Sequence, residues 1–296
     1  MVSKVQINDL ITNIYSFIST QAKEKKAKSL IVNITGGVDS AVSAALCVRT
    51  GINTILVHQE DSEWSAKERC LELIRTLNVQ NIPISLKDIL YRLAVQVSSC
   101  HVVDSKTSKR HQRALTSTLT TSALDYISKV HNGIIVGAGN KDEDMLIHCY
   151  YRRGSGAVDI QPLGDIHKSE IYEMAKHLEI PNSIIRASSS TDIWGGDETR
   201  PPEDIDDVHI SSEELEWARK EVDNWLNVFN INIDPLYIED FYQLDKPLFF
   251  LYAEEIKAQW TERQKEVMNE VISLEFSSRH KVNNDIPIFY KACREV

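Results

Sequence analysis

The chain has 296 residues, and 43 acidic side chains outnumber 33 lysines and arginines to give a net charge of −10. That balance argues against a general nucleic-acid binder, and five cysteines without a C-x-x-C pair argue against a zinc or dithiol centre. There is no membrane-length apolar run and no signal-peptide pattern, so we expect a cytoplasmic protein.

The first half of the chain predicts an alternation of strands and helices. Apolar, β-branched runs predict strands at 29–35, 53–59, 81–86 and 133–138. Helical spacing of apolar residues predicts helices at 5–27, 39–49, 64–78 and 112–130. Such alternation favours parallel pairing with right-handed crossovers. The predicted fold class is therefore α/β, with an open, doubly wound, mostly parallel sheet flanked by helices.

The second half is less regular. A polar segment follows residue 140, and a helix is predicted from Lys168 to just before Pro181. Residues 187–210 carry glycines, prolines and many acidic side chains, which is typical of either a solvated loop or a functional flap. Further helices are predicted near 212–229 and 248–276, giving a helical C-terminal part at 212–296 within a single domain spanning 1–296.

A glycine-rich turn connects the first strand to the next helix, in the stretch ITGGVDSAVSAAL at 34–46. The plain alternative is a tight turn that happens to contain glycines. However, a strand–turn–helix junction gathers free backbone N–H groups at the positive end of a helix dipole, which suits phosphate. Gly36 and Gly37 let an anion approach the backbone, and Thr35 and Ser40 add hydroxyl donors. Asp39 is explained if it holds a magnesium ion that bridges phosphates.

These residues resemble the S-G-G-x-D-S motif of the pyrophosphate-loop ATPases, with threonine for the first serine. The chain most resembles the ammonia-dependent NAD synthetase branch, and the resemblance runs nearly end to end. It is carried by ITGGVDSAVSAAL, IIVGAGNKDED, VDIQPLGDIHKSEIYEMAKHLEIP, SSSTDIWGGDE and RHKVNNDIP, in the order in which that family has them. The resemblance implies an adenine nucleotide alpha hydrolase-like fold, ATP as co-substrate, Mg²⁺, and a homodimer.

The resemblance also implies roles for particular residues. The ATP and pyrophosphate site would comprise Thr35, Gly36, Gly37, Val38, Asp39, Ser40, Lys168 and Ser190. The catalytic residues would be Asp39, Glu143 and Lys168, with Asp39 and Glu143 binding the metal. The substrate would meet Arg152, Asp159, His280 and Lys281. The alternative for Glu143 and Lys168 is a pair of surface charges, and for His280 and Lys281 a simple tail.

Departures from the family pattern cluster on the substrate side. Ala138 replaces a threonine, Ser155 replaces an aspartate, and Ala187 replaces a lysine. The helix before the fourth strand lacks the family's arginines, and Val282 replaces the arginine after His-Lys. Losing a bidentate cation at an anion site is not neutral. The pattern therefore predicts intact ATP activation with altered substrate recognition.

The resemblance implies an ATP-dependent amide ligase. It would adenylate a carboxylate, first of all that of deamido-NAD, and amidate it with ammonia, releasing AMP and pyrophosphate. The chain shows no cysteine near residue 1 for a glutaminase, so free ammonia or a separate glutaminase would supply nitrogen. The alternatives are the same chemistry on another small carboxylic acid, a tRNA-modifying pyrophosphate-loop enzyme, and a nucleotide-binding protein without catalysis.

Overall fold

The computed structural model describes residues 4–98, 105–144, 146–147, 149–187, 210–228 and 259–278. Its centre is a parallel sheet in the order β3-β2-β1-β4. The strands are β1 (Ser29–Asn33), β2 (Asn53–Gln59), β3 (Gln80–Ile84) and β4 (Gly133–Val136). The predicted strands and their parallel pairing are confirmed, and β1, whose three central residues are apolar, is buried along most of its length.

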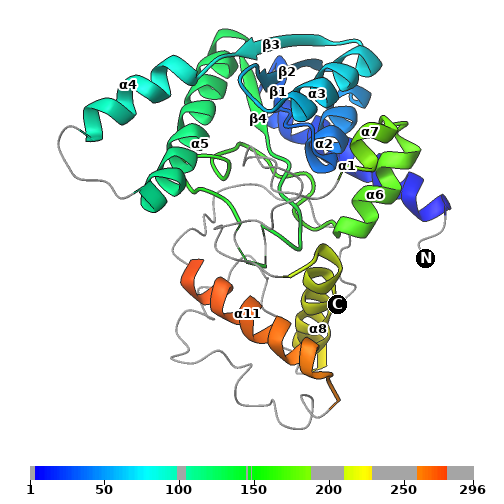
Figure 1. Cartoon of the computed structure of the whole chain (residues 1–296). Helices are drawn as coiled ribbons and strands as arrows, with labels where there is room; N and C mark the ends of the chain where they lie inside the picture. The colour runs from blue at the N-terminus through cyan, green and yellow to red at the C-terminus, as the bar shows by residue number, and fades with distance from the viewer. Residues whose placement is uncertain are drawn as a thin grey trace.

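Helices cover both faces of the sheet (Figure 1). One face carries α1 (Lys4–Glu24), α2 (Val38–Arg49), α3 (Trp64–Leu77) and α6 (Lys168–His177). The other face is covered by α5 (Ser105–Val130), whose Leu124 and Ile127 pack on Ile31 and Ile135 of the sheet. The doubly wound α/β prediction is therefore correct.

The order of the strands fixes where a ligand can bind. From the central β1 the chain goes to β2 and β3 on one side, and later returns to β4 on the other side. The carboxyl ends of β1 and β4 therefore face a topological switch point, where open α/β sheets bind their ligands. The two glycine-rich stretches, 35–37 and 137–139, follow those two strands and meet there. A hydrogen bond of 2.9 Å from Ser43 Oγ to the Gly137 carbonyl joins the 137–139 stretch to α2, the helix that follows the 35–37 stretch.

Several elements differ from the prediction. The helix α4 (Lys87–Ser98) was not predicted, and α5 begins at Ser105 rather than at 112. The start of α4 is capped from a distant segment, because Asp61 accepts hydrogen bonds from the N–H groups of Leu86 and Lys87. The edge strand β3 is largely exposed, and it contains Pro83, which lacks the N–H that a central strand would need.

Two later helices, α8 (Ser212–Val228) and α11 (Glu262–Ser278), form a second, smaller core, whereas Ile184 of the short helix α7 (Asn182–Ile185) packs in the main core. Leu215 and Ala218 of α8 pack with Val267 and Met268 of α11. Figure 1 shows this pair of helices below the sheet domain. The described part of the region predicted as a helix at 248–276 contains α11, which begins at Glu262 and ends at Ser278. No helix within the described ranges is long and apolar enough to cross a membrane.

Candidate active site

The turn after β1 has the geometry that a phosphate loop requires. Gly36 has φ +84°, a conformation that glycine adopts at little cost, and a Cβ there would lie 2.7 Å from the carbonyl oxygen of Ala66 in α3. Arg69 of α3 donates from Nε to the Gly36 carbonyl at 2.9 Å. The loop is therefore clamped against α3, with its backbone next to the start of α2.

The hydroxyls of the loop hold its shape. Ser40 Oγ accepts a hydrogen bond from the Thr35 N–H at 3.2 Å and donates to the Gly37 carbonyl at 3.0 Å. Thr35 Oγ1 accepts from the Gly37 N–H at 3.4 Å. Val38 and Asp39 begin α2, so their side of the turn carries the positive end of that helix. The predicted loop residues 35–40 are thus one folded unit.

Lys168 lies between the two predicted metal ligands. Its Nζ donates to Asp39 Oδ2 at 2.6 Å and to Glu143 Oε1 at 3.0 Å. The lysine side chain is 6% exposed, whereas Asp39 and Glu143 keep 21% and 33% of their side chains in contact with solvent. The structure therefore brings together all three predicted catalytic residues, from three distant parts of the chain. They are not scattered surface charges.

The electrostatics of this cluster follow from burial and mutual pairing. Burial alone would lower the pKa of Lys168, but the charges of Asp39 and Glu143 outweigh it and raise that pKa, so the lysine stays protonated. Burial raises the pKa of Glu143, and the nearby Asp39 carboxylate acts in the same direction, while Lys168 opposes both. Two carboxylates share one ammonium here, and a further cation beside Glu143 would favour the charged form of that carboxyl.

Asp39 and Glu143 offer magnesium two carboxylates but not a complete set of protein ligands. Among the described residues, no group of three or more His, Cys, Asp and Glu converges as a metal cage. Asp39 and Glu143 are two carboxylates that reach the same ammonium nitrogen. Magnesium typically uses one or two carboxylates together with phosphate oxygens and water. The pair therefore fits a metal that arrives with a nucleotide rather than a resident ion.

Two buried residues that the sequence analysis did not select organise the cluster. Asn140, 1% exposed, donates from Nδ2 to Asp39 Oδ1 at 3.1 Å, and its Oδ1 accepts from the Asp142 and Glu143 N–H groups. Asp142 is fully buried and binds the start of α6. Both lie in the IIVGAGNKDED stretch that carries the family resemblance, which usually reads G-T-x-N-x-x-E in the family. The asparagine of that pattern offered a signal for Asn140, and the pattern offered none for Asp142.

The predicted substrate residues are only partly placed. Arg152 is exposed on the segment after residue 149. Asp159 uses its Oδ2 to accept the Ile135 N–H at 2.7 Å, so at least one carboxylate oxygen completes the hydrogen bonding of β4. Ser190, His280 and Lys281 lie outside the described residues, as does most of the 187–210 flap. Ser155 is held to α5 through its N–H and Ser117 Oγ, at 2.9 Å.

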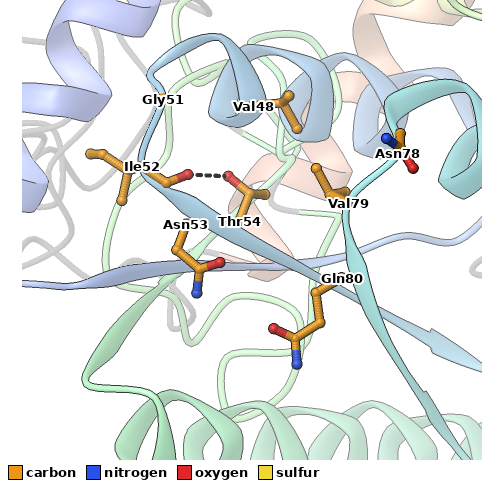
Figure 2. Close-up of a pocket in the computed structure, with 8 residues that line it drawn as sticks. All are labelled: Val48, Gly51, Ile52, Asn53, Thr54, Asn78, Val79 and Gln80. Atoms are coloured by element: carbon orange, nitrogen blue, oxygen red, sulfur yellow. Dashed lines mark hydrogen bonds between the residues drawn. The ribbon is translucent and has the colours of Figure 1, made fainter.

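A cavity of about 370 Å³ lies elsewhere (Figure 2). It is lined by residues at the amino ends of β2 and β3, among them Asn53, Thr54, Asn78 and Gln80. In parallel strands the amino ends are opposite the carboxyl ends, where the 35–40 loop lies. This cavity is therefore separate from the candidate active site and contains none of its residues.

Comparison with known proteins agrees with this arrangement. An NH(3)-dependent NAD(+) synthetase from Methanococcoides burtonii is 29% identical over 221 residues, covering 72% of this chain and 77% of that protein. The structure of an NMN synthetase from Francisella tularensis aligns with TM-score 0.70 and 19% identity, covering 94% and 96% of the two chains. An NH3-dependent NAD synthetase from Campylobacter jejuni aligns with TM-score 0.65 and 18% identity, covering the same shares.

At these identities the structural matches show the fold alone, which is that of the NAD synthetases. The family match is wider, because the family model described as NAD synthase matches residues 10–284, nearly the whole chain. The chain therefore belongs to the NAD synthase family, whose members are ATP-dependent ligases that form a carbon–nitrogen bond.

Proposed function

We propose that the protein amidates the nicotinate carboxylate of deamido-NAD with ammonia, using ATP and releasing AMP and pyrophosphate. The observation that carries this proposal is the Asp39–Lys168–Glu143 cluster beside the 35–40 loop at the switch point of the sheet. An anion-binding loop, two metal-binding carboxylates and a buried cation are the groups that activation of a carboxylate by ATP needs. The relatives named NH(3)-dependent NAD(+) synthetases support the choice of substrate and of nitrogen source.

In the proposed mechanism the substrate carboxylate attacks the α-phosphorus of ATP. Pyrophosphate leaves towards the 35–40 loop, where backbone N–H groups and the hydroxyls of Thr35 and Ser40 receive its charge. Lys168 is charged and lies beside the loop, so its ammonium is placed to meet phosphate oxygens. Asp39 and Glu143 would hold magnesium, which supplies charge neutralisation for the phosphates. Ammonia then attacks the acyl adenylate and displaces AMP.

The substrate side departs most from the family pattern, because Ala138 lacks a threonine hydroxyl, and Ser155 and Ala187 carry no charge where an aspartate and a lysine are usual. Arg152 and Arg153 are exposed on the segment that follows the site, and Arg186 is exposed just before the flap. We propose that these arginines take over part of the contact with the dinucleotide phosphates, together with His280 and Lys281. Ser190 of the flap would meet the ATP phosphates. Asp159 would approach the substrate with its remaining carboxylate oxygen.

The assembly also remains a proposal. The helix α4 extends away from the sheet domain beside α5 (Figure 1). It exposes apolar side chains, among them Tyr91 at 71% and Val97 at 57%. An apolar helix of this kind fits the homodimer that the family resemblance implies. Light scattering of the purified protein would give the mass, and a monomer at micromolar concentration would contradict the homodimer. Consumption of ATP and a soluble dinucleotide fits the cytoplasm as the site of action.

The deciding test of function is steady-state kinetics of pyrophosphate release with ATP, ammonium and a panel of acids. We expect turnover of deamido-NAD at about 1 s⁻¹ or faster with a micromolar Michaelis constant, as enzymes show on their own substrates. The panel includes nicotinate mononucleotide, because one structural neighbour is named an NMN synthetase. A preference for that acid, or no turnover of deamido-NAD, would contradict the proposed substrate. Glutamine in place of ammonium should give no product.

A further inference from the structure

The buried carboxylate of Asp142 joins the two loops that carry Glu143 and Lys168. Its Oδ2 accepts the backbone N–H of Lys168 at 2.8 Å. Its Oδ1 lies 2.7 Å from Nδ1 of His167, which is hydrogen-bonding distance. Asp142 is 0% exposed and His167 is 8% exposed. Removing a carboxylate from water costs free energy, and these two hydrogen bonds offset part of that cost.

This contact lies next to two of the candidate active-site residues in the chain. Asp142 immediately precedes the metal-ligand candidate Glu143, and its partner is the backbone of the candidate phosphate-binding Lys168. The side chain of Asp142 thus ties the loop after β4 to the backbone of the first residue of α6. The distance of 3.0 Å between Lys168 Nζ and Glu143 Oε1 spans the same two segments. Moving the start of α6 would therefore move the lysine relative to both carboxylates.

Neighbouring contacts hold the same helix end but do not replace Asp142. Glu170 caps the His167 N–H at 3.0 Å, and Glu216 of α8 accepts the Ser169 N–H at 3.1 Å. Both bind residues beside Lys168, and neither comes from the loop that carries Glu143. The loop that carries Glu143 makes two further contacts just before α6, from the Lys141 N–H to the Ile166 carbonyl at 3.0 Å and from Lys141 Nζ to Asp165 at 2.9 Å. Among the described side chains of this loop, that of Asp142 is the one that binds the backbone of Lys168 itself.

We propose that Asp142 is a positioning residue for adenylation, which places Lys168 so that its ammonium can meet the phosphate charge that develops as pyrophosphate leaves. This inference rests on the proposed function for the role of Lys168. Interactions that strengthen in the transition state act on kcat rather than on substrate affinity. Misplacement of a charged group by about 1 Å can cost about 100-fold in rate.

The test compares Asp142→Ala and Asp142→Asn in the full-length protein. The alanine variant removes both hydrogen bonds, whereas asparagine can still accept the Lys168 N–H and can donate to the His167 ring in its other tautomer. We expect alanine to lower kcat by about 100-fold, with the Michaelis constant for ATP changed by less than about threefold. Asparagine should recover kcat to within about fivefold of the parent protein. If the alanine variant does not fold, Asp142→Ser replaces it.

The matched control is Asp165→Ala. Asp165 also takes part in an ion pair between the same two segments, with its side chain 21% exposed, but its carboxylate binds Lys141 at 2.9 Å and not Lys168. We expect this variant to lose stability while keeping kcat within about threefold of the parent. Normal kcat in Asp142→Ala, or an equal loss in the alanine and asparagine variants, would overturn the positioning role. The second result would assign the effect to the charge of Asp142.

A readout without turnover separates this inference from the proposed substrate. Amine acylation followed by peptide mass spectrometry measures how often each lysine becomes accessible. Asp142→Ala should raise the labelling of Lys168 at least about threefold relative to Lys141, and Asp165→Ala should show the reverse preference. Unchanged relative labelling of Lys168 would overturn the inference even if deamido-NAD proves to be the substrate. A parent protein inactive on deamido-NAD would contradict the proposed function alone.

Discussion

Replacement of Gly36 by alanine should disable the phosphate loop, and Gly51 provides a matched control. Both glycines have positive φ, +84° and +74°. A Cβ at Gly36 would lie 2.7 Å from the carbonyl oxygen and 3.1 Å from the Cα of Ala66, whereas a Cβ at Gly51 would have nothing within 4 Å. The obstacle at Gly36 is helix backbone, which cannot move aside as a side chain could. The two variants therefore share the cost of the left-handed conformation and differ in the clash.

The magnitudes follow from these two terms. A non-glycine residue in the left-handed region costs about 1–2 kcal/mol, and overpacking against fixed neighbours costs about 1–3 kcal/mol more. We therefore expect the free energy of unfolding to fall by about 1–2 kcal/mol in Gly51→Ala and by about 2–5 kcal/mol in Gly36→Ala. Only the second variant should lose pyrophosphate release, by about 100-fold, since the loop must shift away from α3.

Urea denaturation followed by circular dichroism measures the stability of both variants, and the pyrophosphate assay is run well below their unfolding transitions. Equal destabilisation of the two variants would show that α3 yields to the new methyl group. Full activity in Gly36→Ala would refute the argument that the clamp on α3 shapes the anion-binding backbone.

Three further predictions concern acidic side chains. Asp39→Ala should lower pyrophosphate release by orders of magnitude in a folded protein, and near-normal release would exclude a metal-binding role. Burial opposes the charged form of Asp61, but hydrogen bonds from the start of α4 outweigh it and lower its pKa below 3.8. The Asp61 carboxylate therefore stabilises the fold above that pH, and this contribution is lost as the pH falls through the lowered pKa. In Asp61→Asn, the free energy of unfolding measured by urea titration should therefore decrease less as the pH is lowered than it does in the parent protein. Glu216→Ala should cost about 1–3 kcal/mol of unfolding free energy, because it strands the N–H of Ser169, whereas Glu221→Ala on the same helix is expected to be nearly neutral.

Much of the candidate site could be predicted before the structure. The apolar runs predicted parallel strands, and the carboxyl ends of neighbouring parallel strands meet at one edge. That rule alone brings the 35–40 loop next to the 137–143 stretch. Lys168 came from the family resemblance, and the structure places it on Asp39, 129 residues away in the chain. The substrate roles of Arg152, Asp159, His280 and Lys281 remain predictions.

Other features could not be found in local patterns. The helix α4 begins where Asp61, more than twenty residues earlier, caps its first N–H groups, so the signal for its start is not in the adjacent sequence. Asp142 reads in the sequence as one acid in the exposed-looking run KDED. Burial turned it into a fixed contact, because the start of α6 presents an N–H and a histidine to it. A charge run alone would have suggested a solvated face.

The sequence by itself determined the class of chemistry and the kind of fold. Glycine spacing, strand periodicity and the order of the motifs are local properties, and they suffice to predict an anion loop at the end of a parallel strand. Only the tertiary structure decided which charges face each other and which are withdrawn from water. Those outcomes depend on contacts between segments such as β1, the β4 loop and α6, which pack together only when the sheet order brings them to one edge. The sequence can therefore name the residues of the candidate site, whereas their mutual distances and their burial depend on the folded chain.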